Sequence, residues 1–231
     1  MISLSVVLPA YNEASNIEKT VNETGSYLER RFRDYEIIVV NDGSIDKTRE
    51  IVEKLSLSNP RVMLVNHPTN LGYGSALRSG FDKSVLDYIF FMDSDGQFDI
   101  NDVDRFLPYL DNYDVVVGYR EKRADPLIRS LNTWLYHLYI RFLFGLTIKD
   151  MDCAFKMFKR SAYLMVKPIK SDGALFSAEF LIKLKKREVA IREVSVRHFP
   201  RRFGKQTGAN IKVIMRMFKE CWKLKDELKV L

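Results

Sequence analysis

Short apolar runs alternate with segments of helical periodicity along the first half of the chain. The runs are rich in β-branched and aromatic residues, as in LSVVL and EIIVV, which predicts strands buried on both faces. Between them, apolar residues recur every three or four positions, which predicts helices with one apolar side. The predicted strands cover residues 4–8, 36–40, 62–65, 88–92 and 114–117, and the predicted helices cover 14–32, 46–55, 73–85 and 101–110. This alternation predicts an α/β fold with a mostly parallel sheet and helices on both faces.

The pattern changes after residue 120. A long aromatic-rich helix is predicted over residues 127–145, and a basic helix begins at about residue 209. Between them, the stretches CAFKMF and VAIREVSVRHF are strand-like in composition and flank a predicted helix at 178–186. The sequence has no linker rich in proline, glycine or serine, so we expect one compact domain with two halves, residues 1–120 and 121–231.

Polar residues follow the predicted strands at the point where each strand ends. Strand one is followed by Tyr-Asn-Glu, which ends in Glu13, and strand two is followed by Asp42. Asp93 and Asp95 follow strand four, and Arg120 follows strand five. Ligands bind beyond the carboxyl ends of the strands in open α/β sheets. We therefore expect these acids and the arginine to gather at one edge of the sheet.

The spacing of Asp93 and Asp95 predicts a cation site. Side chains two residues apart in an extended segment point the same way, so both carboxylates can face one hard ion. Mg²⁺ or Mn²⁺ is held in proteins by one or two carboxylates together with substrate phosphates and water. Alternatives are a solvated turn or a dehalogenase-type phosphatase, but the latter needs the pair after its first strand. The order of Gly96 and Gln97 excludes a calcium loop of the EF-hand type.

The net charge indicates the kind of partner that the protein binds, and the cysteine content indicates its compartment. The formal net charge of +7 favours anionic partners, which include nucleotides, phosphate groups, acidic lipids and nucleic acid. Two cysteines, Cys153 and Cys221, are too few for a disulfide framework and fit a reducing, cytoplasmic compartment.

The first residues do not have the pattern of a signal peptide, and Arg129 and Arg141 argue against a spanning helix in the apolar stretch 126–146.

Four ordered motifs, VVLPAYNE, VVNDGSIDKT, NLGYGSALRSGF and FFMDSDGQFD, extend over most of residues 4–120. With them the chain resembles the family 2 glycosyltransferases of GT-A fold, and most of all the polyprenyl-phosphate (dolichyl-phosphate) mannosyl- and glucosyltransferases. The later stretches DMDCAFKMFKR, ALFSAEF and VSVRHFPRRFGKQTGAN resemble the bacterial and archaeal branch. The resemblance implies that residues 1–120 bind a nucleotide sugar and that residues 121–231 bind the acceptor.

The resemblance also implies roles for single residues. Asp95, Arg120 and Arg129 would carry catalysis, and Asp93, Asp95 and Gln97 would hold Mg²⁺ or Mn²⁺. The full set implied to bind the donor and metal is Pro9, Tyr11, Glu13, Val40, Asp42, Asp93, Ser94, Asp95, Gln97, Arg120, Arg201 and Lys205. Some mannosyl-transferring relatives have a lysine six residues after the arginine, where this chain has Thr207, and this difference leaves the donor sugar open.

The function that this resemblance implies is metal-dependent, inverting transfer of a hexose, mannose or glucose, from a GDP- or UDP-sugar to an isoprenoid-lipid phosphate. A lipid phosphate is already anionic near neutral pH, so it can attack without a dedicated base. Transfer to a saccharide hydroxyl is the alternative, and it would need a base such as Asp152 or Glu179. A non-catalytic scaffold that binds membrane or nucleic acid is a second alternative, but it does not explain the acids at the strand ends, so we expect no nucleic-acid partner.

Two helices predict contact with a membrane surface. A wide apolar face on the first is formed by Leu127, Leu131, Trp134, Leu135, Leu138, Phe142 and Leu143. The last helix sets apolar residues such as Phe218 and Trp222 against lysines and arginines, a pattern typical of interfacial anchors. Packing on the sheet, in a homo-oligomer or against a membrane protein is the alternative. We therefore expect a peripheral enzyme on the cytoplasmic face of a membrane.

Overall fold

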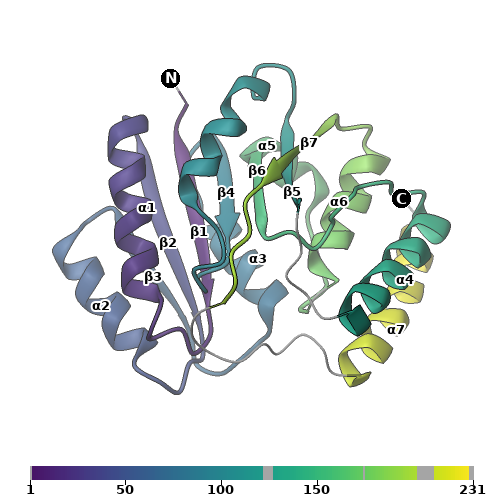
Figure 1. Cartoon of the computed structure of the whole chain (residues 1–231), viewed down its shortest axis with the longest axis horizontal. Coiled ribbons are helices and arrows are strands. Elements are labelled where there is room, and N and C mark those ends of the chain that lie inside the picture. Colours follow the sequence, from purple (N-terminus) through teal and green to yellow (C-terminus); the bar gives the residue numbers. More distant parts are fainter. Residues whose placement is uncertain (1, 122–126, 174, 202–210, 229–231) are drawn as a thin grey trace.

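A seven-stranded sheet forms the centre of the computed structural model of the chain (Figure 1). Residues 2–121, 127–173, 175–201 and 211–228 are described, with side chains throughout except at 127–133 and 211–219. The strand order is β3-β2-β1-β4-β6-β5-β7. The strands are Leu4–Ala10 (β1), Tyr35–Asp42 (β2), Val62–His67 (β3), Tyr88–Met92 (β4), Val115–Arg120 (β5), Phe155–Lys159 (β6) and Ile191–Val196 (β7).

The predicted sheet is confirmed as mostly parallel, with one strand reversed. β6 lies antiparallel between β4 and β5, as the pairs Phe91↔Lys156 and Val117↔Lys156 show. Two reversals leave β5 parallel to β4, so both strands end at the same edge of the sheet. Because β6 runs the other way, its first residues and the preceding turn at 150–154 lie at that edge too. The reversed strand therefore brings a part of the second half to the edge where the predicted acids lie.

Helices cover both faces of the sheet, as predicted. They are Ile17–Arg31 (α1), Thr48–Ser58 (α2), Tyr73–Lys83 (α3), Leu127–Phe144 (α4), Arg160–Val166 (α5), Phe176–Lys186 (α6) and Ile211–Leu228 (α7). Alternate strand residues face opposite layers: Val6 packs with α1 and α2, and Val7 packs with α3, α5 and α6. No helix in the described ranges is both long and apolar enough to cross a membrane.

Residues 100–109 differ from the predicted helix at 101–110. They form two short 3₁₀ helices, Ile100–Arg105 (η1) and Leu107–Tyr109 (η2). Pro108 lies inside the segment and has no N–H to donate to a carbonyl four residues earlier, so a continuous α-helix cannot form. The short helix α5 was not predicted.

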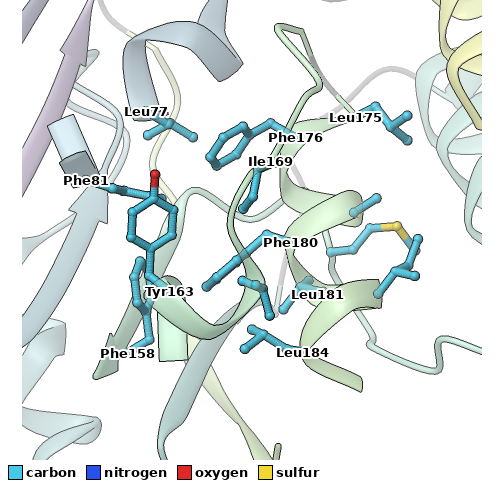
Figure 2. Close-up of a cluster of buried hydrophobic side chains, with 14 of the residues drawn as sticks. Leu77, Phe81, Phe158, Tyr163, Ile169, Leu175, Phe176, Phe180, Leu181 and Leu184 are labelled. Atoms are coloured by element: carbon cyan, nitrogen blue, oxygen red, sulfur yellow. The ribbon is translucent and has the colours of Figure 1, made fainter. Parts of the chain in front are cut away.

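An aromatic cluster between the sheet and α6 fixes the position of α3 (Figure 2). The ring of Phe81 lies 5.1 Å from that of Phe158 and 5.3 Å from that of Tyr163, centroid to centroid. Phe176 and Phe180 of α6 complete the group around Phe81. Edge-on aromatic pairs of this kind stabilise a core beyond the area that they bury. The cluster thereby holds α3, whose first residue lies at the acidic edge.

Both halves of the chain contribute strands to this sheet. β6 and β7 belong to residues 121–231, and they pair with β4 and β5 of residues 1–120. The two halves therefore share one sheet and its core. The assignment of donor binding to one half and acceptor binding to the other stays a prediction.

Replacing Phe81 with alanine should lower the free energy of unfolding by about 3–5 kcal/mol, the usual cost of removing a buried phenyl ring. The measurement is urea denaturation followed by circular dichroism. Leu57→Ala is the matched control, because this side chain is 88% exposed and its loss should change stability by less than about 0.5 kcal/mol. Equal effects of the two substitutions would contradict the role of the cluster.

Candidate functional site

The turn after β4 connects the ends of two neighbouring strands. Ser94 is buried, and its hydroxyl donates a hydrogen bond to the carbonyl of Pro9 in β1 at 2.8 Å. Asp93 precedes it and accepts a hydrogen bond from the Tyr73 hydroxyl at 2.9 Å. The predicted acidic motif is therefore fixed on both sides, by β1 and by the start of α3.

Asp95 is the second carboxylate of this turn. Its Oδ1 accepts a hydrogen bond from the Gln97 amide at 3.0 Å, and Gly96 between them has a φ of 74°, which favours glycine. Its Oδ2 lies 3.5 Å from Nη1 of Arg201. The Asp95 side chain is buried apart from its outer edge, so it faces a restricted space.

The electrostatics of the pair favour a bound cation. Burial and the nearby Asp95 carboxylate raise the pKa of Asp93, and burial raises the pKa of Asp95. A divalent ion would relieve both effects, and oxygen atoms are the ligands that Mg²⁺ and Mn²⁺ prefer. In the described part of the chain no three His, Cys, Asp or Glu side chains come together as a metal cage. The residues present therefore fit an ion that takes its other ligands from a substrate or water.

Gln97, the third predicted metal ligand, is tied to the segment after β7. Its side-chain amide donates to the Phe199 carbonyl at 2.9 Å, and the Phe199 amide donates to the Gln97 carbonyl at 2.9 Å. These bonds connect the acidic turn to a segment about a hundred residues later. Metal binding by Gln97 stays a prediction.

Glu13 is paired with Arg201. Their side chains form a salt bridge, and the other Glu13 oxygen accepts a hydrogen bond from Asn16 Nδ2 at 2.7 Å. Burial raises the pKa of Glu13, while Asn16 and Arg201 act against that rise. Both carboxylate oxygens thus contact protein groups in this structure, and the predicted contact with the nucleotide stays a prediction.

Asp42 is buried at the end of β2 and holds the loop that precedes α3. It accepts hydrogen bonds from the backbone amides of Leu71 and Gly72, each at 2.9 Å, and lies 2.7 Å from His67 Nδ1. Gly72 has a φ of 101°, and a Cβ there would lie 2.5 Å from the Asp172 carbonyl oxygen. The loop conformation therefore requires glycine. The predicted role of Asp42 at the base and ribose stays a prediction, and the loop contact is an additional role.

Tyr73 is a site residue that the sequence did not reveal. Asp42 fixes the loop, the loop places Tyr73 at the start of α3, and the Tyr73 hydroxyl reaches Asp93. In the motif NLGYG, Gly72 directly precedes α3, and a Cβ on Gly74 would lie 2.5 Å from the Ser171 carbonyl oxygen. Nothing in the letters indicates the direction of the tyrosine, because that depends on how α3 packs on the sheet.

Arg120 lies at the end of β5 as predicted, and its partner is Asp150. The guanidinium binds both carboxylate oxygens, at 2.7 and 3.0 Å, and the pair is nearly buried. Burial alone would lower the pKa of Arg120, but the hydrogen bonds and charge of Asp150 raise it. Two of the five N–H groups of the guanidinium are used in this pair, so the fork keeps donors for a phosphate.

Other acids considered from the sequence have different partners from those expected. From the sequence, Asp150, Asp152 and Glu179 either orient the acceptor or pair with Lys156 and Arg197. Glu179 instead binds Lys183 at 2.6 Å, and the ion pairs of Arg197 are with Asp99 and Asp102. The buried Lys156 donates to the carbonyl of Cys153, which is a close neighbour along the chain.

Glu179 lies in an environment that stabilises its charge. Its oxygens accept from the Ser171 hydroxyl at 2.6 Å and from the amides of Ser171 and Lys170 at 2.8 and 3.0 Å. Burial alone would raise the pKa of Glu179, but the hydrogen bonds from Lys183 and Ser171 lower it. A buried carboxylate with a lowered pKa is a weak base. Asp152, the other base considered, is partly exposed and lies 3.2 Å from His137 Nε2.

A groove of about 710 Å³ leads to the acidic turn. It lies between α1 and the residues after β4, with Asp93 and Asp95 in its wall beside Asn16, Lys19 and Phe199. Tyr11 is partly exposed near the end of β1, and the Val40 side chain is buried in the core. Lys205 and the side chain of Arg129 lie outside the described residues.

Comparison with known proteins gives three findings. The family described as glycosyl transferase family 2 matches residues 5–164. A dolichyl-phosphate beta-glucosyltransferase of Trichomonas vaginalis is 34% identical over 208 residues, which cover 82% of this chain and 62% of that protein. The dolichyl-phosphate beta-glucosyltransferase of Saccharomyces cerevisiae is 28% identical over 222 residues, which cover 84% of this chain and 66% of that protein. The chain thus spans less than two thirds of the length of either relative.

A solved structure confirms the predicted fold. Glucosyl-3-phosphoglycerate synthase from Mycobacterium tuberculosis, crystallised with Mg²⁺ and uridine diphosphate, superposes with a TM-score of 0.74. The superposition covers 97% of this chain and 80% of that chain, at 18% sequence identity. The likeness shows the GT-A fold, with the β4 turn at the carboxyl edge of a mostly parallel sheet.

Glu179→Gln should reduce the acid dependence of stability. The folded-state pKa of Glu179 is lowered, so its contribution is fully present above the unfolded-state pKa of about 4.5 and is lost as the pH falls through the folded-state value. The substitution should lower stability near pH 7 by about 1–3 kcal/mol and make the loss below pH 5 shallower. Urea denaturation at several pH values measures this. An unchanged slope would contradict the structural role of Glu179.

Proposed function

The chain belongs to glycosyltransferase family 2, and from this premise we propose that it transfers a hexose from a nucleoside-diphosphate sugar to a polyprenyl or dolichyl phosphate. The observation that carries the proposal is the turn of Asp93, Ser94 and Asp95, which joins the ends of β1 and β4. Relatives that are dolichyl-phosphate glucosyltransferases support the acceptor class. Their names favour glucose over mannose as the sugar.

The donor side of the proposed reaction uses the edge between β2 and β4. Pro9, Tyr11 and Asp42 would lie along the base and ribose, and Ser94 would lie along the sugar. Mg²⁺ or Mn²⁺, held by Asp93, Asp95 and Gln97, would supply positive charge to the departing diphosphate. The Tyr73 hydroxyl fixes the orientation of Asp93, which supports a defined geometry for that charge.

The acceptor side uses arginines around β5. Asp150 holds Arg120 in place, so its remaining N–H groups are preorganised toward a phosphate. We propose that Arg129 and Lys205 meet the same or the neighbouring phosphate group. The lipid phosphate is ionised and attacks directly, so no base is needed. The low basicity of Glu179 supports this proposal over transfer to a saccharide hydroxyl, for which Asp152 would be the base.

A membrane surface is the proposed location of the acceptor, on the cytoplasmic face. α4 and α7 lie side by side at one end of the molecule (Figure 1). Phe142 and Trp134 of α4 are 85% and 59% exposed, and Trp222 of α7 is 55% exposed. The exposed Arg141 and Lys223 lie next to these rings in the sequence. Exposed aromatic residues beside cations are typical of surfaces that bind anionic lipids.

Incubation with labelled nucleotide sugars and a polyprenyl phosphate tests the proposed reaction. The wild-type protein should form a labelled lipid phosphate sugar and release a nucleoside diphosphate, and EDTA should stop the transfer. Asp95→Ala should reduce turnover on the order of 10²–10³-fold, because it removes charge stabilisation at the leaving group. Asp111→Ala, an exposed residue remote from the edge, is the control and should retain activity.

Two outcomes would overturn the proposal. Full activity of Asp95→Ala in EDTA would remove the metal from the mechanism. Transfer to a glycan without phosphate, lost in Asp152→Asn, would establish the saccharide-hydroxyl alternative instead.

Phe142→Ser should weaken binding to vesicles that contain anionic phospholipid by about tenfold or more, since an exposed phenyl ring would lose about 1.5–3 kcal/mol of burial in the lipid interface. Cosedimentation measures this. Val85→Ser is the matched control, because Val85 is exposed in the turn before β4 and belongs to neither α4 nor α7. Equal vesicle binding by both variants would show that α4 does not face the membrane.

A further inference from the structure

Arg201 lies among the carboxylates that the proposed reaction assigns to the metal. Its guanidinium pairs with Glu13, and its Nη1 lies 3.5 Å from Oδ2 of Asp95. All three side chains are largely buried, with 17% of Arg201 and 10% of each carboxylate side chain exposed. The arginine thus places a positive charge between the end of β1 and the turn after β4.

The backbone brings Arg201 to this place from far along the chain. Glu13 and Arg201 are 188 residues apart in sequence. The segment after β7 runs across the front of the sheet to the edge where β1 ends (Figure 1). Two backbone and side-chain contacts between Phe199 and Gln97 fix its register two residues before the arginine. The position of Arg201 therefore follows from a structured crossing and not from a chance surface contact.

A divalent ion and the guanidinium of Arg201 would compete for the Asp95 carboxylate in this geometry. Mg²⁺ binds a carboxylate oxygen at about 2.0–2.1 Å. The guanidinium nitrogen already lies 3.5 Å from Oδ2 of Asp95, so the ion and the arginine would be close neighbours of like charge. Their repulsion in a largely buried site is strong. Repulsion thus favours movement of the guanidinium away from Asp95 when a divalent ion binds there, while Glu13 keeps its contact with the other guanidinium nitrogen.

We propose that Arg201 is the internal counter-cation of the acidic site, which neutralises Asp95 until a divalent ion takes its place, and that Glu13 is the residue that positions it. This inference rests on the proposed function, because it uses Asp95 as a metal ligand. When the divalent ion binds, one guanidinium nitrogen of Arg201 becomes available to a phosphate. The salt bridge with Glu13 keeps the side chain at the site. Glu13 is accordingly a positioning residue for Arg201.

Binding of Mn²⁺ without nucleotide tests the competition, with free Mn²⁺ measured by electron paramagnetic resonance. Arg201→Gln should bind Mn²⁺ more tightly than the wild type by about three- to tenfold, the range for a partly screened ion pair. Arg201→Lys keeps the charge and should stay closer to the wild type. Arg49→Gln is the matched control for net charge, because Arg49 pairs with Glu53 on the exposed side of α2, and it should not change the affinity.

The role of Glu13 is tested in a double-mutant cycle. If Glu13 holds the arginine at Asp95, the gain in Mn²⁺ affinity from Arg201→Gln should fall to less than about twofold in a Glu13→Gln background. A gain of the same size in both backgrounds would contradict the positioning role. A second measurement needs only the wild-type protein: the ¹⁵Nε signal of Arg201 should shift on addition of Mg²⁺, and an unchanged signal at saturating Mg²⁺ would overturn the exchange.

Addition of uridine or guanosine diphosphate separates this inference from the proposed function. If the wild type binds Mn²⁺ neither alone nor with either nucleotide, the proposed metal site itself fails. If it binds Mn²⁺ with nucleotide, but Arg201→Gln matches the wild type without nucleotide, only the counter-cation role of Arg201 fails.

Discussion

Repulsion between carboxylates at the end of β1 and β4 is the constraint on which the rest of this edge depends. The negative charge of Asp95 raises the pKa of Asp93, and Glu13 adds a third negative group nearby. Such a group of acids is stable only with hydrogen-bond donors and cations around it. Tyr73, the Gln97 amide and Arg201 supply them in this structure. The turn, the loop before α3 and the segment after β7 all meet at this point.

The supports of the acids come from both faces of the sheet and from both halves of the chain. Tyr73 belongs to α3, which the aromatic cluster around Phe81 holds against β4 and β6. Arg201 arrives from the segment after β7, on the other side of the edge. The neighbouring Arg120–Asp150 pair combines the end of β5 with the turn before the reversed strand β6. Packing in the two core layers thus fixes the positions of the side chains in this small polar site.

Charge balance differs along this edge, and the difference gives each part its proposed role. Arg120 is matched by Asp150, so that pair is neutral and keeps unused donors directed by a rigid fork. The turn after β4 has more negative charge than Arg201 alone can neutralise, so it is the part of the edge that we propose binds a divalent cation. A nucleoside diphosphate bridged by that cation and a phosphate near Arg120 would then lie side by side. The exposed aromatic residues of α4 and α7 form the surface that we propose contacts lipid.

Much of this arrangement follows from the sequence by itself. Continuous apolar runs and helices of period 3.6 determine the strands of the first half and the two-faced sheet, because burial of apolar surface leaves few other solutions. Since all parallel strands end at one edge, the positions of Asp42, Asp93, Asp95 and Arg120 at that edge follow directly. The ordered motifs add the family, which the match over residues 5–164 confirms.

The tertiary structure alone decided which groups meet. The reversal of β6 depends on pairing between strands more than sixty residues apart, and it brings Asp150 to Arg120. The contact of Tyr73 with Asp93 depends on the packing of α3, and the contact of Arg201 with Glu13 depends on the path of the segment after β7.

Pro108 converts a helical pattern into two 3₁₀ turns, a local effect that the periodicity obscured. Periodicity reports which face of an element is buried, but it carries no information about the distant partner of a polar side chain, because that partner is chosen by the packing of the whole fold.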